Sequence, residues 1–178
     1  MPTLVTTRLT LRPFRESDVD RVVELASDRR VAEMTQNIPH PYLHEHAKTW
    51  IGSHAERFGQ QQELVFAIEE REAGLLIGAI GLVFQSEHQS AELGYWIGVP
   101  YWGKGYCTEA ARAVVDYGFL ELGLHRVQAR HFLKNPASGR VMQKIGMSYE
   151  GCLRQSVLKW GAYQDVCIYA LLGRSRDD

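Results

Sequence analysis

The chain has 178 residues, of which 45% are hydrophobic and 23% are charged, and its formal net charge is -1 at pH 7. This length predicts one domain over residues 1–178, and the composition is that of an ordinary globular protein. A near-neutral charge argues against direct nucleic-acid binding, because proteins that bind phosphate backbones usually carry a basic excess. No apolar stretch approaches the length of a membrane span.

The N-terminal residues and the cysteines predict a cytoplasmic protein. Residues 1–10 lack the basic start and apolar stretch of a secretion signal. The cysteines are Cys107, Cys152 and Cys167, an odd number without a CxxC pair, which indicates free thiols in a reducing compartment. A disulfide between Cys152 and Cys167 is the less favoured alternative.

The first third of the chain predicts one extended segment followed by two helices. Residues 4–14 alternate loosely, as an extended segment does. Ser17 is a candidate N-cap for a helix that carries an apolar stripe to Ala26, and 45–58 show a second helical spacing. The stretch 28–45 contains two prolines and is predicted to be irregular.

The remaining two thirds are rich in strands. Asn135 and Gly146 bracket a short helix as N-cap and terminating glycine, with a proline at the first helical position. The other predicted elements, in chain order, are strands 64–68 and 75–84 as a hairpin, strand 91–99, helix 108–121, strand 125–133, and strands 149–158 and 163–172 joined by a turn at Gly161.

Strands 91–99 and 125–133 flank one crossover helix, so we expect them to run parallel. The hairpins make the other pairs antiparallel. The predicted fold class is therefore α+β, with one mixed, mostly antiparallel sheet of about seven strands, one parallel crossover pair and about four flanking helices.

A glycine-bearing loop, Trp102–Thr108, connects a predicted strand to a helix start. A helix N-terminus exposes unpaired N–H groups, and glycines let the backbone approach a ligand, so the loop suits a phosphate or pyrophosphate. The same two glycines would also serve a simple tight turn. The spacing matches neither a P-loop nor the GxGxxG dinucleotide fingerprint.

Several segments in a fixed order resemble the GNAT superfamily of N-acetyltransferases, within its ribosomal-protein N-terminal acetyltransferase-like group. The resemblance covers nearly the whole chain as a single GNAT-type domain. It is carried by TTRLTLRPFRESD at 6–18, IGAIGL at 77–82, AELGYWIGVPYWGKGYCTEAARAVVDYGF at 91–119, LHRVQARHFLKNPASGRVMQKIGM at 124–147, EGCLRQS at 150–156 and GAYQDVCIYALL at 161–172.

This resemblance implies acetyl-CoA as co-substrate and a set of residues that bind it. The backbone around Ile97, Gly98 and Val99 would pair with the pantetheine arm, Asn135 would hydrogen-bond that arm, and Lys144 would reach the phosphates. Pro100 stands where the family signature has Gln or Arg. The pyrophosphate cradle would be Gly103, Lys104, Gly105, Tyr106, Cys107 and Thr108.

Direct acetyl transfer to an amine needs a proton acceptor for the amine and a proton donor for the thiolate. By resemblance, Glu92 is the candidate base and Ser138 the candidate acid. Glu92 would otherwise be a solvated strand residue, and Ser138 an ordinary first-turn residue. Cys107 at a helix start could suggest a nucleophile, but no Cys/His/Asp arrangement accompanies it.

The acceptor stays open between a protein N-terminal α-amine, such as that of a ribosomal protein, and a small amine such as an antibiotic, polyamine or amino acid. A non-catalytic acyl-CoA-binding module is a further alternative. His40, His44 and His46 do not show a zinc pattern, so no metal is expected. Monomer and homodimer are both compatible with the sequence.

Overall fold

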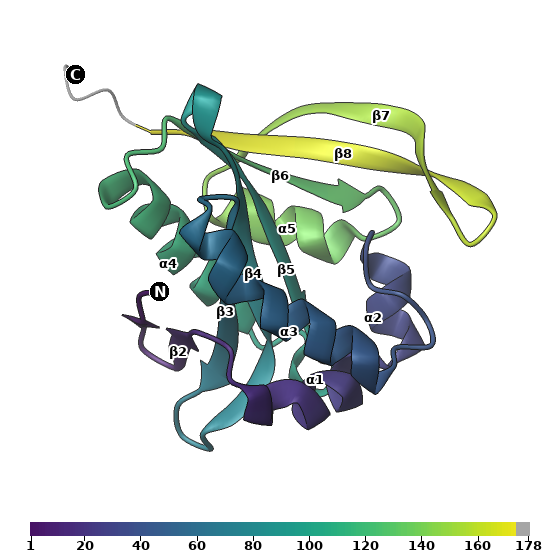
Figure 1. The fold of residues 1–178 in the computed structure, drawn as a ribbon. Coiled ribbons are helices and arrows are strands. Elements are labelled where there is room, and N and C mark those ends of the chain that lie inside the picture. Colours follow the sequence, from purple (N-terminus) through teal and green to yellow (C-terminus); the bar gives the residue numbers. More distant parts are fainter. Residues whose placement is uncertain (174–178) are drawn as a thin grey trace.

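The computed structural model describes residues 1–173, which form one eight-stranded sheet and five α-helices (Figure 1). The elements, in chain order, are β1 Leu4–Val5, β2 Leu9–Arg12, α1 Val19–Ala26, α2 Arg29–Met34, α3 His44–Gly59, β3 Glu63–Glu70, β4 Leu75–Gln85, β5 Ser90–Ile97, α4 Tyr106–Leu120, β6 Arg126–Phe132, α5 Pro136–Lys144, β7 Ser148–Lys159 and β8 Ala162–Leu172.

The strand order is β1-β2-β3-β4-β5-β6-β8-β7, and only β5 and β6 pair in parallel among the described residues. The crossover between them is α4, as the sequence predicted. The hairpins β3–β4 and β7–β8 are antiparallel, and Trp160 and Gly161 at the second turn both have positive φ. The predicted α+β class with one mixed sheet is therefore confirmed.

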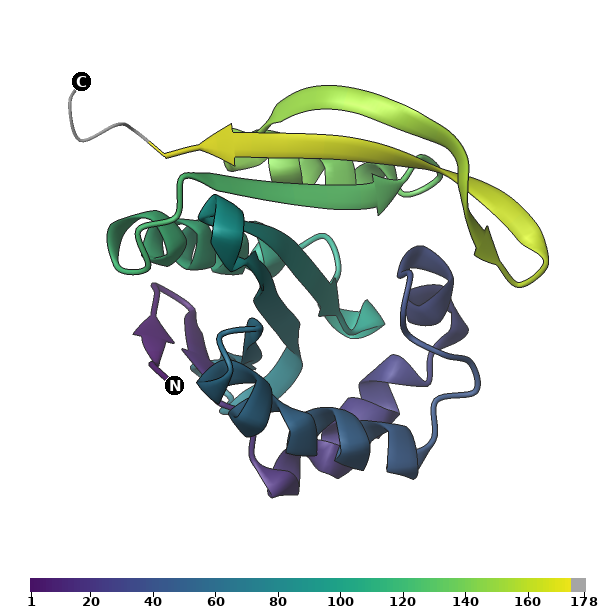
Figure 2. The same cartoon turned by 45° about the horizontal axis from the view of Figure 1, so that its top comes forward.

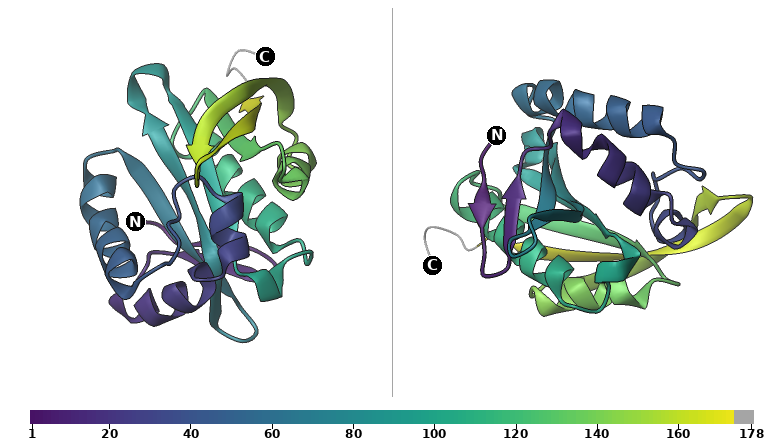
Figure 3. Two further views of the ribbon diagram at one scale, coloured as in Figure 1. Left: turned by 90° about the vertical axis from the view of Figure 1, so that its right-hand side faces the viewer. Right: turned by 90° about the horizontal axis from the view of Figure 1, so that it is seen from below.

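Helices cover both faces of the sheet. The right panel of Figure 3 shows α1 and α3 on one side of the strands and α4 and α5 on the other. The alternation of β5 explains the layers, because Leu93 and Ile97 point into the core beside α4. Trp96, one position out of phase, packs instead against the cluster built by α1 and α3.

Two predictions for the first third of the chain were wrong. Residues 28–45 are not irregular throughout, because α2 lies within them and α3 begins at His44. The Asp28 carboxylate caps α2 by accepting the N–H of Arg30 at 2.9 Å. With six residues, α2 is too short to display a helical period in the sequence. The extended segment 4–14 also divides into β1 and β2, which gives eight strands instead of about seven.

Ser17 is not the N-cap of the first helix. A 3₁₀ turn, Glu16–Asp18, precedes α1, and the Asp18 carboxylate accepts the N–H of Arg15 at 2.7 Å. Two further element boundaries differ from those predicted from the sequence. The strand expected at 91–99 ends at Ile97 before a 3₁₀ turn, Val99–Tyr101, and α4 begins two residues earlier than expected. Among residues 1–173, no helix has both the length and the hydropathy to cross a membrane.

A buried ion pair joins the first strand pair to α1. Arg12 donates from Nη1 and Nη2 to the two carboxylate oxygens of Asp18, at 2.8 and 2.9 Å, and from Nε to Glu69 at 2.6 Å. Both Arg12 and Asp18 are buried. Burial raises the pKa of Asp18, but the bonds from Arg12 and from the N–H of Arg15 outweigh it and leave the pKa below its usual value.

We predict that Asp18→Ala lowers the free energy of unfolding by about 3 kcal/mol at pH 7, because it leaves a buried guanidinium without its main partner. The depressed pKa of Asp18 gives stability that is present above the unfolded pKa of about 3.9 and is lost as pH falls through the folded value. The difference in the free energy of unfolding between Asp18→Ala and wild type should therefore become smaller below about pH 4.

Urea denaturation across pH measures this difference. Asp20→Ala is the control, because Asp20 lies two residues further along, in the first turn of α1, and its side chain is 88% exposed. Equal stability losses for the two variants would contradict the assigned role of the ion pair.

Candidate active site

The site begins where β5 and β6 separate. The parallel ladder joins Ser90–Leu93 to Arg126–Ala129 and then stops, although both strands continue. Figure 2 shows the two ribbons diverging beyond this point. Because β6 stays paired with β8 as far as Phe132, and β5 stays paired with β4 as far as Ile97, each strand follows its outer neighbour. The facing edges beyond Leu93 are left without a strand partner.

A cavity of about 1420 Å³ occupies this opening. Its lining comes from the diverging parts of β5 and β6, the loop before α4, the start of α5, and the side of α3 and of residues 34–39 that faces the sheet. Ligand pockets for one small molecule usually measure roughly 300–1,000 Å³. The cavity is therefore large enough for two substrates side by side.

The N-terminus of α4 supplies backbone donors to one end of the cavity. Gly103 and Gly105 both have positive φ, of 74° and 80°, and Gly105 is the N-cap without a side-chain cap. The first N–H groups of a helix have no intrahelical acceptor and carry the positive end of its dipole. Tyr106, Cys107 and Thr108 line the cavity here, so the arrangement suits an anion such as pyrophosphate.

Arg8 holds this loop in place, and sequence reasoning missed it. From the turn between β1 and β2, its guanidinium donates to the Lys104 carbonyl at 2.9 Å and to Glu109 at 2.7 Å, and lies 4.6 Å from the centre of the Tyr106 ring. Burial alone would raise the pKa of Glu109, but hydrogen bonds from Thr6 and Arg8 bring it below its usual value. The only signal in the sequence was the position of Arg8 in the family-like segment 6–18.

Glu92 lies at the point where the two strands part and lines the cavity. Its Oε2 accepts from Arg130 Nε at 2.9 Å, from Arg130 Nη2, and from Gln128 Nε2 at 3.5 Å. All the hydrogen bonds that reach Glu92 from the described residues end on Oε2. The carboxylate is thus anchored through one oxygen, and Oε1 has no bond from those residues. No feature of the sequence indicated the pairing of Glu92 with Arg130.

Ser138 lies in the first turn of α5 and meets Tyr95 of β5. The two hydroxyl oxygens are 2.8 Å apart, and Tyr95 also donates to the Ser138 carbonyl at 3.1 Å. Burial raises the pKa of Tyr95 far above its usual value, so Tyr95 stays protonated and serves as a hydrogen-bond partner. Burial of its sulfur raises the pKa of Cys107 to about 12, so this residue stays a neutral thiol.

The other residues expected to bind cofactor divide into two groups. Gly98, Val99 and Lys104 are absent from the cavity lining among the described residues. Gly98 packs against Leu25, since an added Cβ would meet that side chain at 2.6 Å. The residues that do line the cavity are Ile97, Gly103, Gly105, Tyr106, Cys107, Thr108, Asn135 and Lys144.

Two of these lining residues have their polar groups engaged within the protein. The Ile97 carbonyl accepts the indole N–H of Trp102 at 2.6 Å. Asn135 caps α5 as predicted, accepting the N–H of Ser138 at 3.3 Å, and its amide donates to the Met34 carbonyl at 3.4 Å. Lys144 also borders a smaller cavity of about 520 Å³ beside Gly105.

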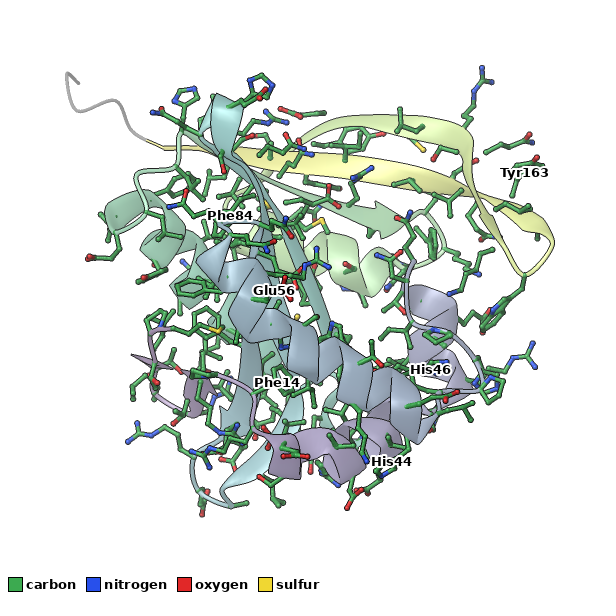
Figure 4. The ribbon with its side chains drawn as sticks, viewed as in Figure 1. Phe14, His44, His46, Glu56, Phe84 and Tyr163 are labelled. Atoms are coloured by element: carbon green, nitrogen blue, oxygen red, sulfur yellow. The ribbon has the colours of Figure 1, made fainter. Side chains whose placement is uncertain are left out.

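Within residues 1–173, no group of three or more His, Cys, Asp or Glu side chains could hold a metal ion. His44 and His46 lie on the first turn of α3 (Figure 4). His44 pairs with Asp20, whereas His46 accepts the N–H of Leu43 at 3.0 Å and lines the cavity. All three cysteines are free thiols, although Cys152 and Cys167 are neighbours across β7 and β8.

Most of the chain, including this site, matches one known protein family. The family described as acetyltransferase (GNAT) domain matches residues 8–148, and the chain belongs to that family. It is 33% identical to the uncharacterized N-acetyltransferase YoaA of Bacillus subtilis over 96% of this chain and 97% of the relative. It is also similar to the putative ribosomal N-acetyltransferase YdaF of Bacillus subtilis (29%; 96% and 94%) and to spermidine N(1)-acetyltransferase of Vibrio cholerae (28%; 89% and 90%).

Solved structures agree with this membership. A GNAT acetyltransferase from Bacillus anthracis superposes with a TM-score of 0.85 at 29% identity, covering 96% of this chain and 98% of that one. RimL, a ribosomal L7/L12 α-N-protein acetyltransferase in complex with coenzyme A, shares the fold at a TM-score of 0.89 and 19% identity, over 97% and 98% of the two chains. The protein is therefore an acyltransferase that transfers an acetyl group.

We predict that Arg8→Ala raises the KM for acetyl-CoA roughly tenfold, equivalent to about 1.4 kcal/mol, because the α4 loop loses its side-chain anchor. The kcat at saturating acetyl-CoA should change little. Initial rates at varied acetyl-CoA concentration measure this effect. The control is Arg154→Ala, which also removes one arginine but at an exposed position of β7. Equal KM values for acetyl-CoA in the two variants would refute the anchoring role of Arg8.

Proposed function

We propose that the acceptor is the α-amine at the N-terminus of a polypeptide. The observation that carries this proposal is the charge of the cavity wall. The carboxylates in the lining are Glu45 and Glu92, and the cations are Arg57, Arg130, Lys134, Arg140 and Lys144. A polyamine carries several positive charges and requires carboxylates to offset them. This wall offers few, and Glu92 is already paired with Arg130.

The charge of the cavity lining remains unfavourable for a polycation even when the two cations on α5 are left out of the count. Arg140 and Lys144 lie on α5, and Lys144 borders the loop before α4, where cofactor phosphates would bind. The charged residues that remain in the lining are Glu45, Glu92, Arg57, Arg130 and Lys134. These two carboxylates and three cations leave a net charge of +1, which repels a polycation more strongly than a peptide whose single α-amine is its only positive charge.

The size of the cavity also supports a peptide acceptor. At about 1420 Å³ it exceeds the usual range for one ligand, roughly 300–1,000 Å³, so space remains beside a bound acetyl-CoA. Among the relatives, one is named for ribosomal acetylation and another for spermidine. Similarity therefore allows both acceptors, and the charge of the wall favours the peptide.

We infer that Glu92 receives or holds the amine. Its Oε1 accepts no hydrogen bond from the described residues, and its Oε2 is held by hydrogen bonds from Arg130. A carboxylate in this state can accept a hydrogen bond from the amine, directly or through a water, and draw off its proton. The amine nitrogen then forms a bond to the acetyl carbon while the carbon–sulfur bond breaks, and the released thiolate needs a proton.

We infer that Ser138 supplies that proton. Its hydroxyl meets Tyr95 at 2.8 Å, and Tyr95 stays protonated because burial raises its pKa. When Tyr95 gives its one proton to Ser138 Oγ instead of to the Ser138 carbonyl, the proton of Ser138 is free to point into the cavity. Asn135 fixes the same helix start through the N–H of Ser138. Tyr95, which also lines the cavity, thus orients the proton donor.

We predict that thiol release from acetyl-CoA is fastest with peptides bearing a free N-terminal α-amine, and at least tenfold slower with spermidine or spermine at equal concentration. The physical reason is the scarcity of free carboxylates in the wall. N-terminally blocked copies of the same peptides are the control. Preferential acetylation of spermidine would overturn the peptide proposal and establish the small-amine alternative.

We further predict that Glu92→Gln and Ser138→Ala each lower kcat by about 10²-fold, the lower end of general acid–base contributions. Neither should change the Kd for acetyl-CoA more than about twofold, a difference below about 0.5 kcal/mol. Steady-state kinetics across pH and calorimetric titration separate the two quantities. Full turnover by Glu92→Gln across pH would remove the base assignment, and an unchanged kcat in Ser138→Ala would remove the acid assignment.

A further inference from the structure

One wall of the cavity has no regular secondary structure. Residues Thr35 to Pro39, between α2 and α3, contribute consecutive side chains to the lining, followed by Tyr42. This stretch, which we call the acceptor-side wall, lines the same cavity as the end of β6 and the β8 residue Val166. An irregular segment loses conformational entropy whenever it is ordered around a ligand. Contacts that order it beforehand therefore favour binding.

Lys159, the last residue of β7, provides such contacts from outside the cavity. Its Nζ donates to the carbonyls of Gln36 at 3.2 Å and Ile38 at 3.0 Å. These two carbonyls accept no other hydrogen bond from the described residues. The lysine is buried, with 9% of its surface exposed. Charge-assisted bonds to two carbonyls compensate for removing the ammonium from water.

The neighbouring Trp160 brings the tip of the β7–β8 hairpin against the same part of the chain. Its ring lies 5.2 Å from the Arg29 guanidinium at the start of α2 and 6.1 Å from the His40 ring. Lys159 Nζ lies 5.1 Å from the same ring. The left panel of Figure 3 shows the hairpin tip reaching over α2. The hairpin thus contacts the start of α2 and His40 as well as Gln36 and Ile38 of the acceptor-side wall.

We propose that Lys159 is a positioning residue for the acceptor, acting through the acceptor-side wall. It holds Gln36 and Ile38 in the conformation that lines the cavity, and so it determines how the acceptor chain lies beside the acetyl group. It contacts neither the amine nor acetyl-CoA. This proposal rests on the proposed function to the extent that the amine acceptor binds along this wall.

The test compares Lys159→Met, which keeps the aliphatic stem but removes the ammonium, with Lys159→Arg, which keeps donors for the two carbonyls. Lys159→Met should raise the acceptor KM about tenfold, while kcat and the Kd for acetyl-CoA stay within about twofold. Lys159→Arg should recover most of the acceptor affinity. Leu158→Ala, at an adjacent side chain that is 60% exposed, is the control and should match wild type.

Hydrogen exchange gives a second measurement that needs no acceptor. Amides within 35–42 should exchange faster in Lys159→Met than in wild type, whereas amides of α4 and β5 should be unchanged. A wild-type acceptor KM in Lys159→Met, unchanged exchange within 35–42, or an equal rise in the KM for acetyl-CoA would each overturn the proposal. If N-terminal peptides fail as acceptors, that failure appears already in the wild-type protein, so the two proposals are distinguishable.

Discussion

The divergence of β5 and β6 beyond Leu93 and Ala129 is the constraint on which the rest of the site depends. Each strand keeps its ladder with its outer neighbour, so the gap between them must widen as the sheet twists. Among residues 1–173, the facing backbone edges then lack a strand partner, at a place bordered by α3 on one face of the sheet and by α4 and α5 on the other. A ligand that supplies hydrogen bonds to one edge completes the sheet there.

Three cationic side chains surround this opening, and each one fixes a different part of the site. Arg8 ties the loop before α4 to the first hairpin, at the end where phosphates would bind. Arg130 fixes Glu92 at the fork between the strands. Lys159 ties the irregular wall to the last hairpin, on the acceptor side. Each anchor is a cation that joins segments far apart in sequence, so each could be altered with limited effect on the others.

Family membership establishes the reaction, whereas the proposal for the acceptor depends on the geometry and charge of the site. The match over residues 8–148 and the similar relatives establish acetyl transfer. They do not choose the acceptor, because relatives with different named acceptors both align with most of the chain, over 96% and 89% of its length. The choice rests on local charge, which is a property of side chains brought together from α3, β5, β6 and α5. This separation is expected, since folds are shared more widely than substrates.

The sequence by itself determined the long elements, the parallel crossover, the glycine loop and the cap of α5 at Asn135. These follow from periodicity and local backbone chemistry, which act over a few residues. Only the tertiary structure decided that α2 exists and that a 3₁₀ turn held by Asp18 precedes α1, where the sequence had predicted an N-cap at Ser17. It also decided the partners of three side chains: Arg130 for Glu92, Tyr95 for Ser138, and the carbonyls of residues 36 and 38 for Lys159. The physical reason is the distance along the chain. The partners of Glu92, Ser138 and Lys159 lie tens of residues away in sequence and meet only when the sheet assembles. The elements at α2 and Asp18 were missed for another reason, because they are too short to show a period.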